Sequence, residues 1–167
     1  MRVIYLHQFF NTPAMSGGVR SYDIANSLVK NGHTVNMVTS MRERTYKDGW
    51  SFTNEDGINT HWLALSYSNK LNYLKRLKAF FFFAFYSAKK GSSLEGDIVY
   101  ASSTPLTIAI PALYISWSKS IPMVFEVRDL WPEVPIAIGV LNNPIIKYLA
   151  KSLERYTFSS NASFNTS

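Results

Sequence analysis

The N-terminal segment, residues 2–40, reads RVIYLHQFFNTPAMSGGVRSYDIANSLVKNGHTVNMVTS. Residues 3–7 form a short apolar run without alternation, which is typical of a strand buried on both faces of a parallel sheet. A loop follows, and apolar residues then recur at helical spacing until Asn31 and Gly32, a common helix end. Residues 34–39 predict a second strand. The segment therefore predicts a βαβ unit whose loop lies at the carboxyl end of its first strand, where open α/β sheets bind ligands.

Two adjacent glycines, Gly17 and Gly18, stand just before the predicted helix. Glycines at this position expose backbone N–H groups to an anion, and the helix N-terminus adds its partial positive charge. A ligand that carries phosphate is therefore expected here. The pair matches neither the dinucleotide pattern G-x-G-x-x-G nor a P-loop, so a plain tight turn is the alternative.

The composition is that of one globular domain, with 167 residues of which 47% are hydrophobic and 17% charged. The absence of cysteine excludes disulfides, a thiolate nucleophile and a Cys-based metal site. A net charge of +6 indicates an acidic partner, which is nucleic acid, anionic lipid or a phosphorylated substrate. No nucleic-acid-binding motif occurs, so nucleic acid is not expected. The N-terminus lacks the core of a signal peptide, and we expect a cytoplasmic protein.

The rest of the chain continues the alternation of strands and helices. The patterns predict strands over 58–64, 97–101, 122–127 and 162–167, helices over 70–90, 105–117 and 142–158, and a loop or β-excursion over 41–56. Pro111 predicts a kink in its helix, and His61 is expected at the surface or on an edge strand. The predicted fold class is α/β: a Rossmann-like, doubly wound, mainly parallel sheet with helices on both faces.

Polar side chains follow two of the predicted strands. Ser103 and Thr104 come after one strand, and Glu126, Arg128 and Asp129 come at the end of the next. Charged groups at the end of a buried strand are in the expected position for a ligand site. The alternative is an ion pair of Arg128 with Asp129 or Glu126 that only organises the turn.

The helix predicted over 70–90 is unusually aromatic and is flanked by cations. One helical stripe holds Leu71, Leu74, Phe81, Phe85 and Ala88, and a second holds Tyr73, Leu77, Phe80 and Ala84. The first stripe fits a helix packed on the sheet. The second stripe then needs another partner, and an apolar face bordered by Lys and Arg is typical of a helix lying on anionic lipid. The predicted membrane-contact residues are Lys75, Arg76, Lys78, Phe80, Phe82 and Phe83.

Four motifs carry a family resemblance: SGGVR at 16–20, NGHTV at 31–35, STP at 103–105 and FEVRDLWPE at 125–133. With these motifs the sequence resembles the N-terminal domain of GT-B glycosyltransferases of family 4. It is most similar to the bacterial fucosamine (FucNAc) transferases of O-antigen and capsule assembly. The resemblance covers essentially the whole chain, and the run ending in Arg-Asp-Leu-Trp-Pro is its most specific part.

The resemblance implies an acceptor-binding Rossmann-like domain over residues 1–167, with the donor-binding C-terminal domain absent from this chain. The implied activity of the full-length protein is retaining transfer from a nucleotide sugar, UDP-linked, to a lipid-linked saccharide at the inner face of the bacterial plasma membrane. The fragment alone is expected to be inactive. GT-B enzymes stabilise the leaving diphosphate without a metal, so no metal or other cofactor is expected.

The resemblance also assigns roles to individual residues. Many relatives place a His-Asp pair at the end of the fifth strand, and Arg128 stands at that His position, which suggests a cation that contacts phosphate or an acceptor hydroxyl. The expected catalytic residues are Arg128 and Asp129, and the expected substrate-binding residues are Gly17, Gly18, Ser103, Thr104 and Glu126.

Two other classes of function are compatible with the pattern. One is a nucleotide-dependent oxidoreductase, which the missing G-x-G-x-x-G and the presence of Ser40 instead of an acidic residue after the second strand disfavour. The other is a non-catalytic module that docks on membranes through the helix at 70–90.

Overall fold

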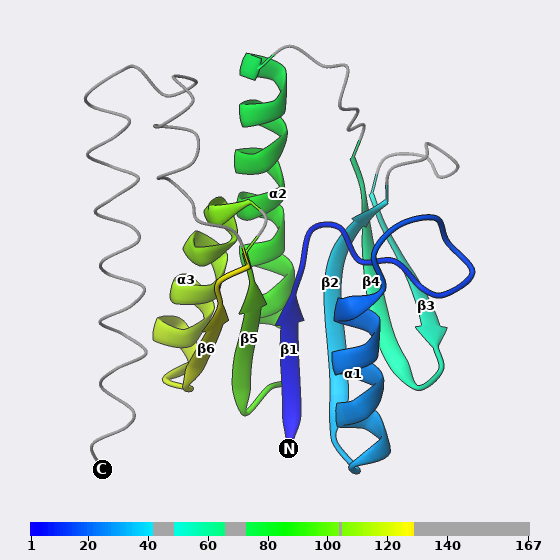
Figure 1. Ribbon diagram of the computed structural model, residues 1–167. Helices are drawn as coiled ribbons and strands as arrows, with labels where there is room; N and C mark the ends of the chain where they lie inside the picture. Colours follow the sequence, from blue (N-terminus) through cyan, green and yellow to red (C-terminus); the bar gives the residue numbers. More distant parts are fainter. Residues whose placement is uncertain (42–48, 66–72, 104, 129–167) are drawn as a thin grey trace.

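The computed structural model describes residues 1–41, 49–65, 73–103 and 105–128 (Figure 1). These residues form a six-stranded sheet in the order β3-β4-β2-β1-β5-β6. The strands are β1 (Arg2–Leu6), β2 (Thr34–Met41), β3 (Trp50–Glu55), β4 (Ile58–Ala64), β5 (Ile98–Ser102) and β6 (Met123–Glu126). All neighbouring pairs are parallel except β3, which pairs antiparallel with β4 at one edge.

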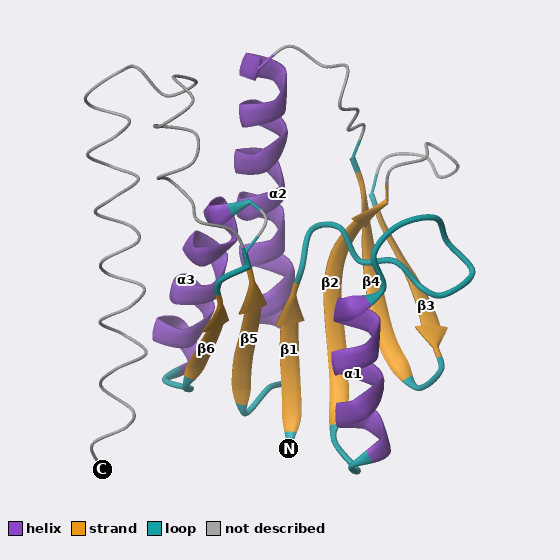
Figure 2. Ribbon diagram, viewed as in Figure 1, coloured by secondary structure: helices purple, strands orange, loops and turns teal. Residues whose placement is uncertain are grey.

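Helices cover both faces of this sheet (Figure 2). Helix α1 (Arg20–Lys30) lies on one face, and α2 (Tyr73–Ser93) and α3 (Ala109–Lys119) lie on the other, with a 3₁₀ turn (Leu106–Ile108) before α3. The predicted α/β, doubly wound, mainly parallel architecture is therefore confirmed. Parallel strands need crossover connections, and helices that alternate with them fall on the two faces of the sheet.

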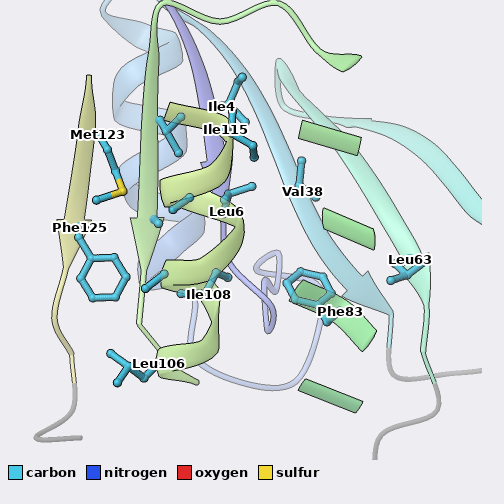
Figure 3. Packing of buried hydrophobic residues seen from close by; sticks show 14 residues of the cluster. Ile4, Leu6, Val38, Leu63, Phe83, Leu106, Ile108, Ile115, Met123 and Phe125 are labelled. Carbon is cyan, nitrogen blue, oxygen red and sulfur yellow. The ribbon is translucent and has the colours of Figure 1, made fainter. Parts of the chain in front are cut away.

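The core has two halves because β1 is buried on both faces. Val3 and Tyr5 point toward α1, and Ile4 and Leu6 point toward α2 and α3. Figure 3 shows the second half, in which Ile4 and Leu6 pack with side chains of the two helices, among them Phe83. A strand with no exposed face has no reason to alternate polar and apolar residues, which accounts for the continuous apolar run in the sequence.

One local expectation is wrong. His61 is buried, because β4 has β2 on one side and β3 on the other and is not an edge strand. The pairing partner β3 arises within the polar 41–56 segment, so the β-excursion is the correct alternative there. Pro111 is the third residue of α3, and the first turn of a helix tolerates proline. The kink at Pro111 stays a prediction.

Several predictions fall outside the described residues. They are the helix over 142–158, the strand over 162–167, and the site residues Thr104 and Asp129.

Candidate functional site at the carboxyl edge of the sheet

The strand order places a switch point between β1 and β5. From β1 the chain continues to β2 on one side, whereas from β5 it continues to β6 on the other. Open α/β sheets bind ligands outside the carboxyl ends of the strands at such a point. Tyr5 and Tyr100 are register partners across this junction, and their ring centroids are 4.7 Å apart on the side of α1. The candidate site therefore lies above this pair of tyrosines.

Tyr5 is fully buried, and its hydroxyl has no hydrogen-bond partner among the residues that the structure describes. Burial raises the pKa of Tyr5 strongly, so the phenol stays neutral. Buried hydroxyls are rarely left without a partner, and those that are require an explanation, of which a functional role is one. The orphaned hydroxyl lies in the same region as Arg20, Glu126 and Arg128, whose charges also act on the pKa of Tyr5.

Glu126, at the end of β6, accepts hydrogen bonds from Arg20 and Ser102. Its Oε1 accepts hydrogen bonds from Nε and Nη2 of Arg20, at 2.9 and 2.6 Å, and its Oε2 accepts one from the Ser102 hydroxyl at 2.7 Å. Burial raises the pKa of Glu126, but these hydrogen bonds outweigh it and leave the pKa below its usual value. The pair with Arg20 joins the start of α1 to the end of β6 across the β1–β5 junction.

Ser103 and Arg128 are joined through the main chain. The Ser103 hydroxyl accepts a hydrogen bond of 2.7 Å from the backbone N–H of Arg128, and the Ser103 N–H donates to the carbonyl of Glu126 at 2.8 Å. The side chain of Arg128 is exposed, and its guanidinium forms no hydrogen bond or ion pair with any residue that the structure describes. Among the described residues, Glu126 therefore forms its ion pair with Arg20 and not with Arg128.

His7 also belongs to this region, although the sequence patterns did not predict it as a site residue. It follows β1 directly, is 3% exposed, and its Nδ1 has no partner among the described residues. Burial lowers the pKa of His7 to about 4, and the positive charge of Arg128 acts in the same direction. The imidazole is therefore neutral at pH 7. The signal for it was its place as the first polar residue after a buried strand.

The two glycines of the β1–α1 loop differ in whether a side chain would fit at their positions. Gly17 has a φ of 139°, and a Cβ there would lie 2.6 Å from Nδ2 of Asn11. That same Nδ2 donates to the carbonyls of Phe9 and Gly18, so it helps to shape the loop. A Cβ on Gly18 would meet nothing within 4 Å. The loop itself therefore needs a glycine at 17, whereas Gly18 leaves open space beside the start of α1.

The outward face of α2 differs from the predicted one. Phe81, Phe82 and Phe85 are 51%, 41% and 68% exposed, whereas Phe83 is 1% exposed and lies in the core (Figure 3). The prediction that Phe83 contacts a membrane is therefore wrong, because the 100° step of the helix turns it toward the sheet. Phe80 is half-buried.

The stripe of α2 that was expected to pack on the sheet has exposed members, and the stripe that was expected to face outward has a buried one. Phe81 and Phe85, from the stripe expected to pack on the sheet, face outward, and Ala84 of the other stripe is buried. Of the predicted cations, Lys75 and Lys78 are exposed, and Arg76 is half-buried. The sequence of α2 contains no Asp or Glu, so its outward face combines exposed phenylalanines with positive charge only.

No described helix has both the length and the apolar character needed to cross a membrane. In the same residues no three His, Asp or Glu side chains gather closely enough to hold a metal ion.

Comparison with known proteins relates the chain to others through its fold. No family model matches the sequence, and no curated protein sequence matches it. Among solved structures, a sucrose-phosphate synthase from Thermosynechococcus elongatus superposes with a TM-score of 0.56 at 10% sequence identity, over 93% of this chain. The chain shares its fold with the matching part of that synthase. It spans 39% of the length of that synthase.

The fold brings together some of the predicted site residues. Glu126, Ser103 and the backbone of Arg128 form one hydrogen-bonded group at the carboxyl edge, and Gly17 and Gly18 lie in the loop that leads to Arg20. Ser102, Arg20, Tyr5 and His7 join them. At 10% identity the likeness to the synthase concerns the fold alone.

Proposed function

We propose that this chain is the acceptor-binding domain of a retaining glycosyltransferase of family 4. The observation that carries the proposal is the exposed side chain of Arg128, whose backbone N–H bonds to Ser103 where β5 and β6 end, next to the β1–β5 switch point. A cation positioned through its main chain keeps its side chain available for a ligand. The glycosyltransferase-like fold and the run FEVRDLWPE at 125–133 support the same class.

The proposed reaction moves a sugar, N-acetyl-fucosamine in the most specific form of the proposal, from a UDP-linked donor to a lipid-linked saccharide of cell-surface polysaccharide. Arg128 and Asp129 act on the reacting groups. Gly17 and Gly18 let the backbone approach the diphosphate, while Ser103, Thr104 and Glu126 shape the acceptor side. Positive charge and backbone N–H groups stabilise the leaving diphosphate, so the reaction proceeds without a metal. The donor is bound mainly by a second domain.

The proposed place of action is the inner face of the bacterial plasma membrane. The outward face of α2 supports this, since it offers Phe81, Phe82 and Phe85 together with Lys75 and Lys78. Aromatic side chains enter the interfacial region of a bilayer, and lysines at their border are attracted by anionic headgroups. The acceptor lipid and the enzyme then meet on the same surface.

Deletion of the gene tests the proposed function. We expect lipid-linked saccharides to accumulate one sugar short, and mass spectrometry of the lipid extract identifies that sugar by the mass difference. The wild-type gene should restore the full saccharide, and a gene encoding Arg128→Met should not. Unchanged lipid-linked saccharides in the deletion strain would overturn the proposal. If the protein still binds vesicles in that case, the membrane-docking module becomes the better explanation.

A further inference from the structure

Arg20 and Glu126 form an ion pair in which only one partner is accessible. Arg20 is the first residue of α1 and follows Gly18 by two positions, and both its Nε and its Nη2 donate to the same oxygen of Glu126. The side chain of Arg20 is 64% exposed, whereas that of Glu126 is 13% exposed. A dissolved ligand can therefore reach the guanidinium while the carboxylate stays in place. Water and salt screen the charge of an exposed guanidinium, so a competing anion can replace the carboxylate as its partner.

The carboxylate of Glu126 keeps other stabilising interactions when Arg20 no longer bonds to it. The Ser102 hydroxyl donates to the second carboxylate oxygen, and the positive charge of Arg128 favours the ionised form of Glu126. The guanidinium of Arg128 forms no hydrogen bond or ion pair within the described residues. The carboxylate of Glu126 thus interacts with the charges of both arginines, so losing Arg20 would not leave it as an isolated buried charge, which would be costly.

We propose that Glu126 stands in for the phosphate of a ligand: it holds Arg20 while the site is empty, and a diphosphate-bearing ligand displaces it from Arg20. This inference rests on the proposed function, because it concerns the same edge of the sheet. A guanidinium pairs with phosphate as readily as with carboxylate, and the neighbouring Gly18 leaves room for a ligand beside the start of α1. In this proposal Arg20 is a ligand-binding residue. Glu126 competes with the ligand for Arg20 and so lowers the affinity of the site for an anion.

Titration of the purified protein with three diphosphates tests the exchange. The probes are inorganic pyrophosphate, UDP and geranyl diphosphate, followed by isothermal titration calorimetry at low and high salt. Glu126→Gln keeps the shape and removes the competing charge, so we expect diphosphate to bind about tenfold tighter at low salt, with a smaller gain at high salt. A gain for UDP alone assigns the diphosphate to the sugar donor, and a gain for geranyl diphosphate alone assigns it to the lipid acceptor. Either result supports the exchange.

Two further variants make the test specific. Glu95→Gln is the matched control. It removes the same charge from the ion pair between Arg2 and Glu95 at the opposite edge of the sheet, where Nη1 of Arg2 lies 2.7 Å from Oε2 of Glu95. The affinity for diphosphate should stay unchanged in this variant. Arg20→Met should weaken binding and abolish the gain caused by Glu126→Gln. Thermal melting of each variant verifies the fold.

The proposal is overturned if the folded Glu126→Gln protein binds all three probes no better than wild type. A gain that persists in the Arg20→Met background, or that Glu95→Gln reproduces, would overturn it as well. The titrations contain no sugar-transfer step. A deletion strain with normal lipid-linked saccharides would therefore reject the proposed reaction while leaving the measured exchange intact.

Discussion

The hydroxyl of Ser103, just after β5, accepts a hydrogen bond of 2.7 Å from the backbone N–H of Arg128, just after β6. A second bond, from the Ser103 N–H to the carbonyl of Glu126, lies beside it. The turn that follows β6 is therefore held by main-chain contacts and one serine. The guanidinium of Arg128 contributes no hydrogen bond to this arrangement in the described part of the chain, so structure and function can be separated by mutation.

Substitution of Arg128 by Met should leave the melting temperature within about 2 °C of wild type, because the backbone bond to Ser103 is kept. Sugar incorporation into lipid-linked saccharides by cell extracts should fall by about 10²-fold, as expected for loss of a charged contact in the transition state. Asp129→Asn is predicted to lower incorporation in the same way. Ser103→Ala removes the acceptor of that backbone bond, and in contrast to Arg128→Met it should cost about 1 kcal/mol of stability. A large loss of melting temperature with normal incorporation in Arg128→Met would identify a structural role.

The two loop glycines should respond differently to substitution. Gly17→Ala forces a side chain into a positive φ and against Asn11, and we expect it to lower the free energy of unfolding by about 1–3 kcal/mol. Gly18→Val meets open space, so the fold should be unaffected while incorporation falls, because the side chain keeps the ligand away from the backbone. Urea denaturation and the incorporation assay measure the two effects. Normal incorporation in Gly18→Val would mean that Gly18 serves only as part of a turn.

Membrane binding should depend on the outward face of α2. Replacing Phe81, Phe82 and Phe85 together by Ser should reduce co-sedimentation with anionic vesicles at least tenfold, since each aromatic ring inserted into the interface contributes on the order of 1 kcal/mol. Lys75→Gln with Lys78→Gln should weaken binding to anionic vesicles by about 1 kcal/mol per lysine and leave neutral vesicles unaffected.

A matched control for this face is Phe52→Ser, on the edge strand β3, where the phenylalanine is 59% exposed. It removes an aromatic ring of similar exposure from a different element and should not change binding. Equal and negligible binding of the wild-type protein to anionic and neutral vesicles would rule out the membrane contact.

Stability should decrease as the pH falls from about 6.5 to 4. His7 and His61 are buried, and burial lowers the pKa of each from 6.5 to about 4. Between these values the unfolded chain binds protons that the folded chain does not, so stability is present at higher pH and is lost on acidification. For His7 alone, protonation lowers the free energy of unfolding by on the order of 3 kcal/mol over the whole range.

The histidine contributions can be separated by urea denaturation between pH 7 and 4.5. His7→Gln should flatten the pH dependence of the free energy of unfolding in this range, and His61→Gln should flatten it further. The lowered pKa values of Asp97 and Glu126 act in the same direction at lower pH, which is why the range stops at 4.5. A slope that His7→Gln leaves unchanged would show that the imidazole is solvated in the folded protein.

Local patterns in the sequence were sufficient to predict the α/β class and most of its elements. The apolar run at β1, the helical spacing that ends at Asn31 and Gly32, and the strand at 58–64 all depend on neighbours within a few residues, and all are confirmed. The positions of Gly17, Ser103, Glu126 and Arg128 at strand or loop ends were also evident, because a strand end follows directly from the strand.

Tertiary structure alone determined which of these groups meet. The Arg20–Glu126 pair joins residues 106 positions apart, and the Tyr5–Tyr100 pair depends on the register of β1 with β5. The burial of His61 depends on β3 arising from a polar segment, and the inward direction of Phe83 depends on where α2 rests on the sheet. Periodicity defines the faces of a helix or strand, but the free energy of burying one face or another is decided by the order and register of strands that are distant in the chain.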